Sequence, residues 1–456
     1  MDDRTPSWGI DPVPERLRVL GLVDTMLLWS NLSVSLLVIV LGAVLVPALS
    51  LEDAVLAIVI GALAGNLLLG FAALIGADAR VPGMVVLRAP LGRRGSYVPT
   101  VVNVAQNLGW STFELIVIST AAAALSKKVF GFEARWAWAI GFGCVAVALA
   151  LLGPIGFVRR YVRKFAVWAV VASMIYLTWW VLDKSNLHQF WHARGYGGLG
   201  LGAGIDIVIG SIVSWTPLAA DYTRFSRDRR SAFLGAGFGY FLPTLWCFGL
   251  GVLLVLARNV TDAADVPAAV AAGGVVSAFA LLALTVDESD EAFADIYSTA
   301  VSIQNVLPRV SQRLLIVLVS ATATVLAVVI DLRNYQAFLL LLGSVFVPLF
   351  GVLLADWLLA GAHYTERDLF AGPAIRAEQL AAWVAGFVLY QWLSPQGPGW
   401  WVDTVAHLHP GHATWTASLP SFAASFVLAT AAGLLRPRED AVRARRRSRE
   451  PLARPR

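Results

Sequence analysis

Charged residues are scarce in this sequence. Only 14% of its 456 residues are Asp, Glu, Lys or Arg, whereas soluble domains carry about 25%. Hydrophobic residues make up 58% and the mean hydropathy is +0.69. Apolar runs recur along the whole length, and a run of about 20 residues suffices to cross a bilayer. The shortage of charge excludes a soluble globular protein and predicts a polytopic membrane protein embedded in lipid.

Several familiar motifs are also missing. The two cysteines, Cys144 and Cys247, lie in apolar runs and are expected to pack, not to form a disulfide framework or a metal site. The phosphate-cradling P-loop pattern does not occur, so direct ATP drive is not supported. The polar N-terminal segment and the long first apolar run do not fit a cleaved signal peptide. No cofactor is expected.

The apolar runs predict an all-α protein with twelve transmembrane helices. Their expected ranges are 20–47, 54–78, 98–126, 137–157, 164–183, 201–220, 232–257, 268–304, 313–331, 334–360, 378–395 and 415–435.

Arginines alternate between the predicted loops. They are concentrated in 79–97, 158–163, 221–231, 305–312 and 361–377, while the intervening loops are poor in Lys and Arg, with 127–136 the exception. By the positive-inside rule this predicts a multi-pass protein of the cell membrane with both termini in the cytoplasm. The basic tail 436–456 is better explained as a topology signal and lipid headgroup contact than as a nucleic-acid site.

Two predicted spans are interrupted by polar or helix-breaking residues. The first carries Trp29, Ser30 and Asn31, and the sixth carries Ser214, Trp215 and Pro217. Broken helices at corresponding positions of two halves point to an inverted-repeat transporter with its site at the breaks. Ordinary kinks are the alternative, since proline and glycine are frequent in membrane helices.

Five carboxylates stand inside the eighth predicted span, in "LLALTVDESDEAFADIYSTAVSIQ". Such a stretch is either a loop between two shorter spans or the face of a wet cavity. The cavity is favoured because each flank has only about 12 residues, against the roughly 20 that a span requires.

Helical spacing sorts these carboxylates. One stripe holds Asp287, Asp290, Glu291 and Asp295, whereas Glu288 points elsewhere and is expected to take no part in the site. The stripe suits cation binding and proton uptake, with Asp287 and Glu291 as candidate proton carriers.

The third span carries a second polar stripe. Asn103, Gln106, Trp110 and Glu114 follow one another at helical spacing. An aromatic face one turn from a buried carboxylate suits a flat heterocycle, although polar contacts between helices are the alternative.

Two further features have plainer explanations. Pro348 and Asp356 in the tenth span are expected to be a kink and an inner-end anchor. The loop "HLHPGH", with His407, His409 and His412, could hold a metal. A polar loop is favoured because no second set of ligands accompanies it.

Four stretches resemble the nucleobase:cation symporter-1 family, the cytosine/purine permeases. They are "GMVVLRAPLGRRGSYVPTVVNVAQNLGW", "SWTPLAADYTRFSRD", "FADIYSTAVSIQNVLP" and "SVFVPLFGVLLADWLL", and they cover nearly the whole chain in order. The resemblance implies a leucine-transporter-type fold of 5+5 inverted repeats with broken helices 1 and 6. The implied division is an N-terminal cytoplasmic segment at 1–19, a transport core at 20–360, helices 11 and 12 at 361–435, and the tail.

The resemblance also implies residue roles. Substrate contacts fall on Trp110, Glu114, Trp215 and Asp295, with Ser214 and Asn31 beside them at the helix breaks. The coupling ion, H⁺ or Na⁺, falls near Trp29, Val286, Ser289 and Asp290. Family members carry amides where this chain has Glu114 and Asp295, and an ionised carboxylate only accepts hydrogen bonds.

The expected substrate is therefore a heterocycle whose edge presents two donors, as aminopyrimidines and aminopurines do. The protein is then a cation-coupled importer working by alternating access, and not an enzyme. A divalent-metal or organic-cation transporter of the same fold is the first alternative. An intramembrane aspartyl hydrolase is the second, disfavoured because the acids crowd one helix. Nothing in the sequence sets an oligomeric state.

Overall fold

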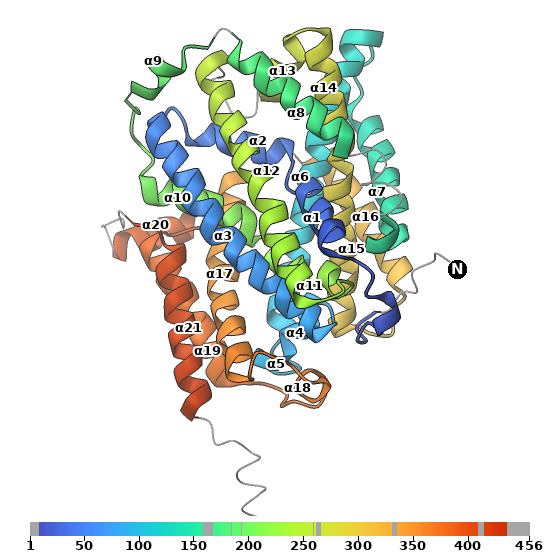
Figure 1. The fold of residues 1–456 in the computed structure, drawn as a ribbon, viewed down its shortest axis with the longest axis vertical. Helices are drawn as coiled ribbons and strands as arrows, with labels where there is room; N and C mark the ends of the chain where they lie inside the picture. The colour runs from blue at the N-terminus through green and yellow to red at the C-terminus, as the bar shows by residue number, and fades with distance from the viewer. Residues whose placement is uncertain are drawn as a thin grey trace, which may run out of the picture.

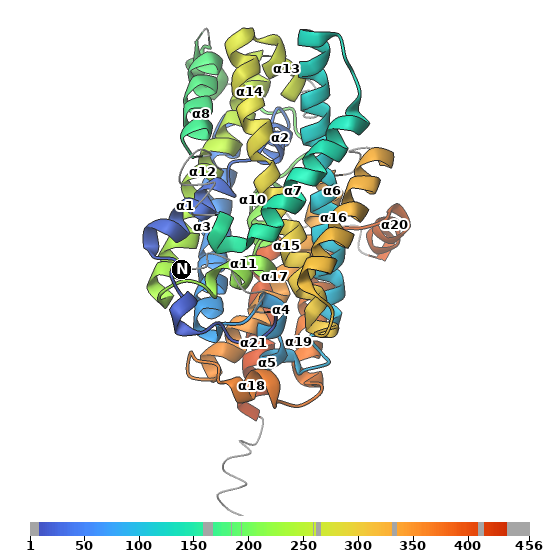
Figure 2. The same cartoon turned by 90° about the vertical axis from the view of Figure 1, so that its right-hand side faces the viewer.

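The computed structural model describes residues 9–157, 167–183, 185–192, 194–258, 260, 266–330, 335–408 and 415–435. Within these ranges the regular structure is helical, apart from one isolated bridge between Leu20 and Ser226. The long helices run roughly side by side and give an elongated molecule (Figures 1 and 2). The predicted all-α fold is confirmed.

The longer helices correspond to the predicted spans. They are α1 (Leu22–Asn31), α2 (Leu36–Leu45), α3 (Leu51–Ala79), α6 (Tyr97–Phe130), α7 (Arg135–Phe157), α8 (Val167–Leu182), α10 (Leu201–Val213), α11 (Thr216–Thr223), α12 (Arg229–Arg258), α13 (Val266–Ala272), α14 (Val275–Asp287), α15 (Ser289–Val306), α16 (Gln312–Val329), α17 (Tyr335–Leu359), α19 (Ala377–Leu393) and α21 (Ser418–Leu435). Short helices fill the connections: η1 (Glu15–Leu17), α4 (Gly83–Val86), α5 (Arg88–Leu91), α9 (Leu187–His192), α18 (Glu366–Phe370) and α20 (Gly399–Leu408).

Among the described residues, eight helices are long and apolar enough to cross a membrane, and the bent pair α1–α2 makes nine. Large apolar side chains such as Val101, Trp136 and Phe279 are more than half exposed on the outside of the bundle, where lipid would cover them. A multi-pass membrane protein follows from these observations. The count of twelve spans stays a prediction.

Both predicted breaks are present. The axes of α1 and α2 differ by 62°, and Ser35 caps α2 by accepting a hydrogen bond from the backbone N–H of Leu37 at 3.0 Å. A turn at Ser214 and Trp215 separates α10 from α11, and Pro217 lies in the first turn of α11, where its missing N–H costs nothing.

The eighth span is broken as well, which was not predicted. The expectation of one helix over 268–304 is wrong: α13 ends before Gly274, whose φ is +120°, and Glu288 separates α14 from α15. The second break falls in the middle of the acidic stretch.

The helices pack in two groups. Helices α1, α2, α3, α10, α11 and α12 pack against one another, and α6, α7, α15 and α16 form the second group. The tenth span, α17, contacts α10 and is covered by α19 and α21. The deepest polar residues lie where the two groups meet, and this junction holds the candidate site.

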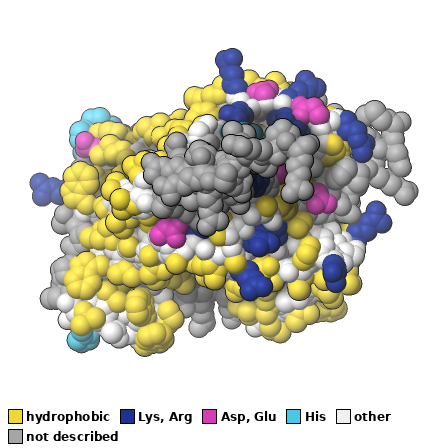
Figure 3. Space-filling model, turned by 90° about the horizontal axis from the view of Figure 1, so that it is seen from below, with side chains coloured by type: hydrophobic (Ala, Val, Ile, Leu, Met, Phe, Trp, Pro, Cys, Tyr) yellow, Lys and Arg dark blue, Asp and Glu magenta, His cyan; other side chains and the backbone are white. Residues whose placement is uncertain are grey.

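The described parts of the predicted inner loops gather at one end of the molecule, near α4, α5 and α18 at the bottom of Figure 1. Lys and Arg side chains stand around this face in Figure 3. Asp356 anchors α17 there, as expected: its Oδ1 accepts from Arg376 Nη1 at 2.5 Å and its Oδ2 from Tyr364 Oη at 3.0 Å. The predicted tail and inner loop 158–163 lie outside the described residues.

Candidate substrate and cation site

A pocket opens between the two helix groups at the level of the breaks. It encloses about 390 Å³ not filled by protein atoms, counting the part open to solvent. Twelve residues line it: Ser35, Leu37, Val38, Leu41, Trp110, Glu114, Ser211, Ser214, Trp215, Tyr240, Glu291 and Asp295. Five of the six predicted substrate contacts are among them.

The pocket has an aromatic wall. Trp110 comes from α6, Trp215 from the turn between α10 and α11, and Tyr240 from α12. The ring centroids of Trp215 and Tyr240 are 6.1 Å apart. Flat aromatic surfaces on different helices suit a planar ligand, which buries both of its faces by stacking.

The polar part of the pocket is acidic. Glu114, Glu291 and Asp295 line it and are at most 6% exposed, and no described lining residue is Lys, Arg or His. Ionised carboxylates accept hydrogen bonds and attract positive charge. A ligand here is favoured if it offers N–H donors or a cationic group.

The carboxylates of the acidic stretch fall into two clusters. In the first, Asn31 Nδ2 donates to Asp287 Oδ1 at 3.2 Å and also to Asp290 Oδ2. Asn31 Oδ1, Asp290 Oδ1 and Ser289 Oγ are buried there without a hydrogen-bond partner among the described residues. These hard oxygen donors, gathered between the first and eighth spans, fit a cation such as Na⁺. We call them the Asp290 cluster.

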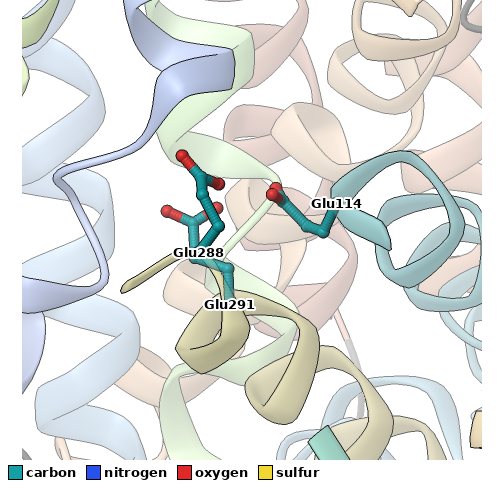
Figure 4. A group of neighbouring side chains, drawn as sticks. All are labelled: Glu114, Glu288 and Glu291. Atoms are coloured by element: carbon teal, nitrogen blue, oxygen red, sulfur yellow. The ribbon is translucent and has the colours of Figure 1, made fainter. Parts of the chain in front are cut away.

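In the second cluster, carboxylate oxygens of Glu114, Glu288 and Glu291 lie within 4.8 Å of one another. Figure 4 shows Glu114 pointing from α6 toward the other two side chains. Two like charges about 5 Å apart repel by roughly 3 kcal/mol at an effective dielectric constant of 20. Three ionised groups would therefore be strongly unfavourable, and this group, the Glu288 cluster, requires protons or a cation.

Glu288 corrects one expectation. It was predicted to lie apart from the site, yet it is 1% exposed and belongs to the Glu288 cluster. The backbone of Glu288 keeps helical dihedral angles, and Glu288 precedes Glu291 at i, i+3 spacing, so the two side chains share one face of the helix. Glu291, predicted as a proton carrier, lies both in this cluster and in the pocket wall.

Three further predicted residues lie beside the pocket lining and not in it. Asn31 contacts the Asp290 cluster and does not line the pocket. Trp29 is fully buried and packs edge-on against Trp215 and Tyr222, with ring centroids 6.0 Å apart in each pair. Val286 is 44% exposed and has an apolar side chain, so only its backbone carbonyl oxygen can bind an ion.

The polar residues of α6 hold the break in the sixth span. Gln106 Nε2 donates to the backbone carbonyl of Ser214 at 2.8 Å, and Asn103 Nδ2 donates to Ser302 Oγ at 2.9 Å. The bond from Gln106 gives a hydrogen-bond partner to the Ser214 carbonyl, in the turn that positions Trp215. These amides link helices, whereas Trp110 and Glu114 of the same stripe face the pocket.

Hydrogen bonds from the end of the sixth span cross between the two helix groups. Tyr222 Oη donates to the backbone carbonyl of Ala294 at 2.9 Å. Arg224 donates from Nη2 to Tyr297 Oη at 2.9 Å and from Nη1 to the carbonyl of Gly9 at 2.8 Å. These three side chains are at most 4% exposed.

Sequence reasoning missed Ser35, Ser211, Tyr240 and Glu288. Ser35 had a usable signal, because a serine directly before an apolar run is a typical helix N-cap. Tyr240 had none, since an aromatic residue in an apolar span is usually packing. His407 lies on α20 with its Nδ1 beside the Asp403 carbonyl, and His409 and His412 lie outside the described residues.

Comparisons with known proteins show which family the chain resembles in sequence. The family model described as permease for cytosine/purines, uracil, thiamine, allantoin matches residues 12–415. A cytosine permease of Escherichia coli K12 is 25% identical over 395 residues, covering 85% of this chain and 89% of that permease. A purine-cytosine permease of Emericella nidulans is 23% identical, covering 67% and 64%.

A solved structure has the same fold. A nucleobase-cation-symport-1 family transporter, in a closed conformation with bromovinylhydantoin bound, superposes with a TM-score of 0.78 at 17% identity, covering 94% of this chain and 95% of that one. A Na⁺-coupled sialic acid symporter superposes at 0.64 and 8% identity. At these identities the likeness concerns the fold.

Proposed function

This chain belongs to the family of permeases for cytosine/purines, uracil, thiamine and allantoin, and we propose that it imports an amino-substituted nucleobase in symport with H⁺ or Na⁺. As a member of this family it is a transporter and not an enzyme.

The observation that carries the proposal is one pocket with two tryptophans and acceptor groups. Trp110 and Trp215 stack the heterocycle, while Glu114 and Asp295 accept from its donor edge. Cytosine and adenine present an exocyclic amino group beside a ring nitrogen that either carries a proton or can accept one. Uracil and hydantoin pair donors with acceptors and leave a carboxylate facing an oxygen, which is unfavourable.

The Asp290 cluster supports the cation-coupled part of the proposal. It joins the break of the first span to the eighth, so an ion held by Asp290, Ser289 and Asn31 would fix two elements of opposite helix groups. Occupancy of this site then favours the arrangement that binds substrate, which is the coupling required for symport.

Alternating access follows from the two helix groups. The group containing α1, α3, α11 and α12 rocks against α6, α7, α15 and α16, and the contacts around Tyr222 and Arg224 open on the inner side. The arginine-rich end then faces the cytoplasm, with both termini on that side.

The test is uptake of radiolabelled cytosine, adenine, uracil and hydantoin into cells that lack their own nucleobase permeases. Cytosine or adenine should accumulate, and a gradient of Na⁺ or of protons, each varied alone, should drive the accumulation. Absence of uptake of every nucleobase under all gradients, with the protein present in the membrane, overturns the proposal.

The Glu288 cluster favours one second candidate, transport of a divalent metal or organic cation. Three carboxylates that close together form a hard-donor set. Uptake of Mn²⁺ that cytosine does not inhibit would favour this candidate, whereas saturable cytosine uptake unaffected by Mn²⁺ excludes it.

A further inference from the structure

The carboxylate of Glu288 sits on the N-terminus of half-helix α2. The backbone N–H of Leu36, the first residue of α2, donates to Glu288 Oε1, and Ser35 Oγ donates to Glu288 Oε2 at 3.2 Å. Ser35 is at the same time the N-cap of this helix. Glu288 itself is 1% exposed and lies at the break between α14 and α15.

This end of a helix favours an anion. The first N–H groups of a helix have no partner within it, and the aligned peptide dipoles place partial positive charge there. In transporters with broken helices, the N-termini of half-helices commonly point at anionic groups of the substrate. In this chain that position is filled by a carboxylate of the protein.

The position matters because α2 forms a wall of the pocket. Leu37, Val38 and Leu41 line it directly after the capped end, together with Ser35. An anchored α2 N-terminus therefore sets the shape of the pocket. It also leaves the pocket with carboxylates and no described basic residue to receive an anionic substrate.

We propose that Glu288 is a built-in anion that fixes half-helix α2 to the break of the eighth span and bars carboxylate-bearing substrates from the pocket. Glu288 is a positioning and specificity-determining residue, and it does not contact the substrate. The substrates admitted are uncharged or cationic heterocycles. The specificity part rests on the proposed function, whereas the anchoring of α2 does not.

Chemical rescue by a small anion tests this role. In Glu288→Ala the carboxylate is lost but space remains for formate. Uptake of labelled cytosine into proteoliposomes should fall by about tenfold or more, since charged hydrogen bonds to two donors are lost. Formate on both sides should restore much of the uptake, while gluconate, which is too large, should not.

Two variants complete the design. Glu288→Gln keeps the volume but loses the charge and one acceptor, so its uptake should be low and insensitive to formate. Glu366→Ala removes an exposed glutamate on α18 and should match the wild type in both salts. Orotate, a carboxylated pyrimidine, should inhibit Glu288→Ala in gluconate and leave the wild type unaffected.

The outcomes separate the inference from the proposed function. Formate should raise the thermal unfolding temperature of Glu288→Ala but not of the wild type, and this readout needs no substrate. If the wild type transports no nucleobase, the proposed function fails, but the unfolding temperatures still test whether Glu288 anchors α2. A folded Glu288→Ala that formate neither activates nor stabilises overturns the inference. If Glu288→Ala does not fold, wild-type uptake by Glu288→Gln overturns it.

Discussion

Glu114 belongs to both parts of the site: it lines the pocket, and its oxygens lie within 4.8 Å of those of Glu288 and Glu291. It is 1% exposed. It stands one turn after Trp110 on α6, so the same helix supplies an aromatic surface and an acceptor. A group in this position can discriminate between heterocycles by the donors on their edges.

Replacing Glu114 by glutamine should change which heterocycle is preferred. An amide offers one acceptor and one donor, whereas an ionised carboxylate offers only acceptors. We expect Glu114→Gln to lower the ratio of cytosine to uracil uptake by about tenfold, the size of one mismatched buried hydrogen bond. Competition between the two labelled bases measures the ratio directly.

Glu366→Gln is the matched control, because Glu366 is exposed on α18. An unchanged cytosine-to-uracil ratio in Glu114→Gln would contradict the assignment of this residue to the substrate edge. A general loss of uptake without a change in the ratio would indicate a structural role only.

At the residue scale, the sequence predicted which side chains meet where they share a continuous helix. Trp110 and Glu114 follow one helical stripe, and both reach the pocket. Glu288 was misjudged because the stripe was counted from Asp287, although Glu288 precedes Glu291 at i, i+3 spacing and shares its face of the helix. Asn31 was placed in the pocket by its proximity to the break, but its side chain turns toward Asp287 and Asp290.

At the scale of elements, α2 depends on close packing against α12. A methyl group on Gly42 would lie 2.2 Å from the backbone oxygen of Phe248, and one on Gly251 would lie 2.0 Å from that of Ile39. Glycines at both positions therefore let the two backbones touch, as small residues do between membrane helices. This crossing holds the middle of α2, whereas Glu288 holds its N-terminal end.

Gly251→Ala should destabilise the protein, because the added methyl group has only backbone to displace. Overpacking of this kind costs about 1–3 kcal/mol, which thermal unfolding of the purified protein would register as a lower transition temperature. Gly249→Ala, on the same helix, meets nothing within 4 Å and should be neutral or slightly stabilising through helix propensity.

The pair of variants is decisive because both make the same chemical change two residues apart. Equal unfolding temperatures for the two would show that the close crossing of α2 and α12 does not exist in solution.

Elements were predictable where the sequence marks their ends. Hydrophobic runs placed the spans within a few residues, and the polar and proline-containing turns located the breaks of the first and sixth. The break at Glu288 and the separation of α13 from α14 have weaker marks. There, tertiary contacts of a buried carboxylate and a glycine of positive φ decide where the helix ends.

At the scale of the whole molecule, transport requires the two helix groups to separate below the pocket. Tyr222 and Arg224 at the end of the sixth span bridge to α15 through the Ala294 carbonyl and Tyr297. Arg224 also holds Gly9 of the N-terminal segment. In the proposed orientation these hydrogen bonds form the inner closure, and weakening them should make the inner side open more often.

Tyr297→Phe should shift the protein toward an inward-open arrangement. The variant leaves one buried N–H of Arg224 without its acceptor, which costs about 1–3 kcal/mol and so raises the open population by about tenfold. A cysteine introduced at Ala294, fully buried when closed, reports on opening by its rate of reaction with a methanethiosulfonate reagent. Cys144, which is exposed, and Cys247 are replaced by serine in this background.

The control is Tyr196→Phe, at a tyrosine that is 87% exposed, which should leave the rate of labelling unchanged. Equal labelling of Tyr297→Phe and the Tyr196→Phe control would show that this contact does not hold the inner side closed, and the closure would then have to reside in Tyr222 and the helix packing around it.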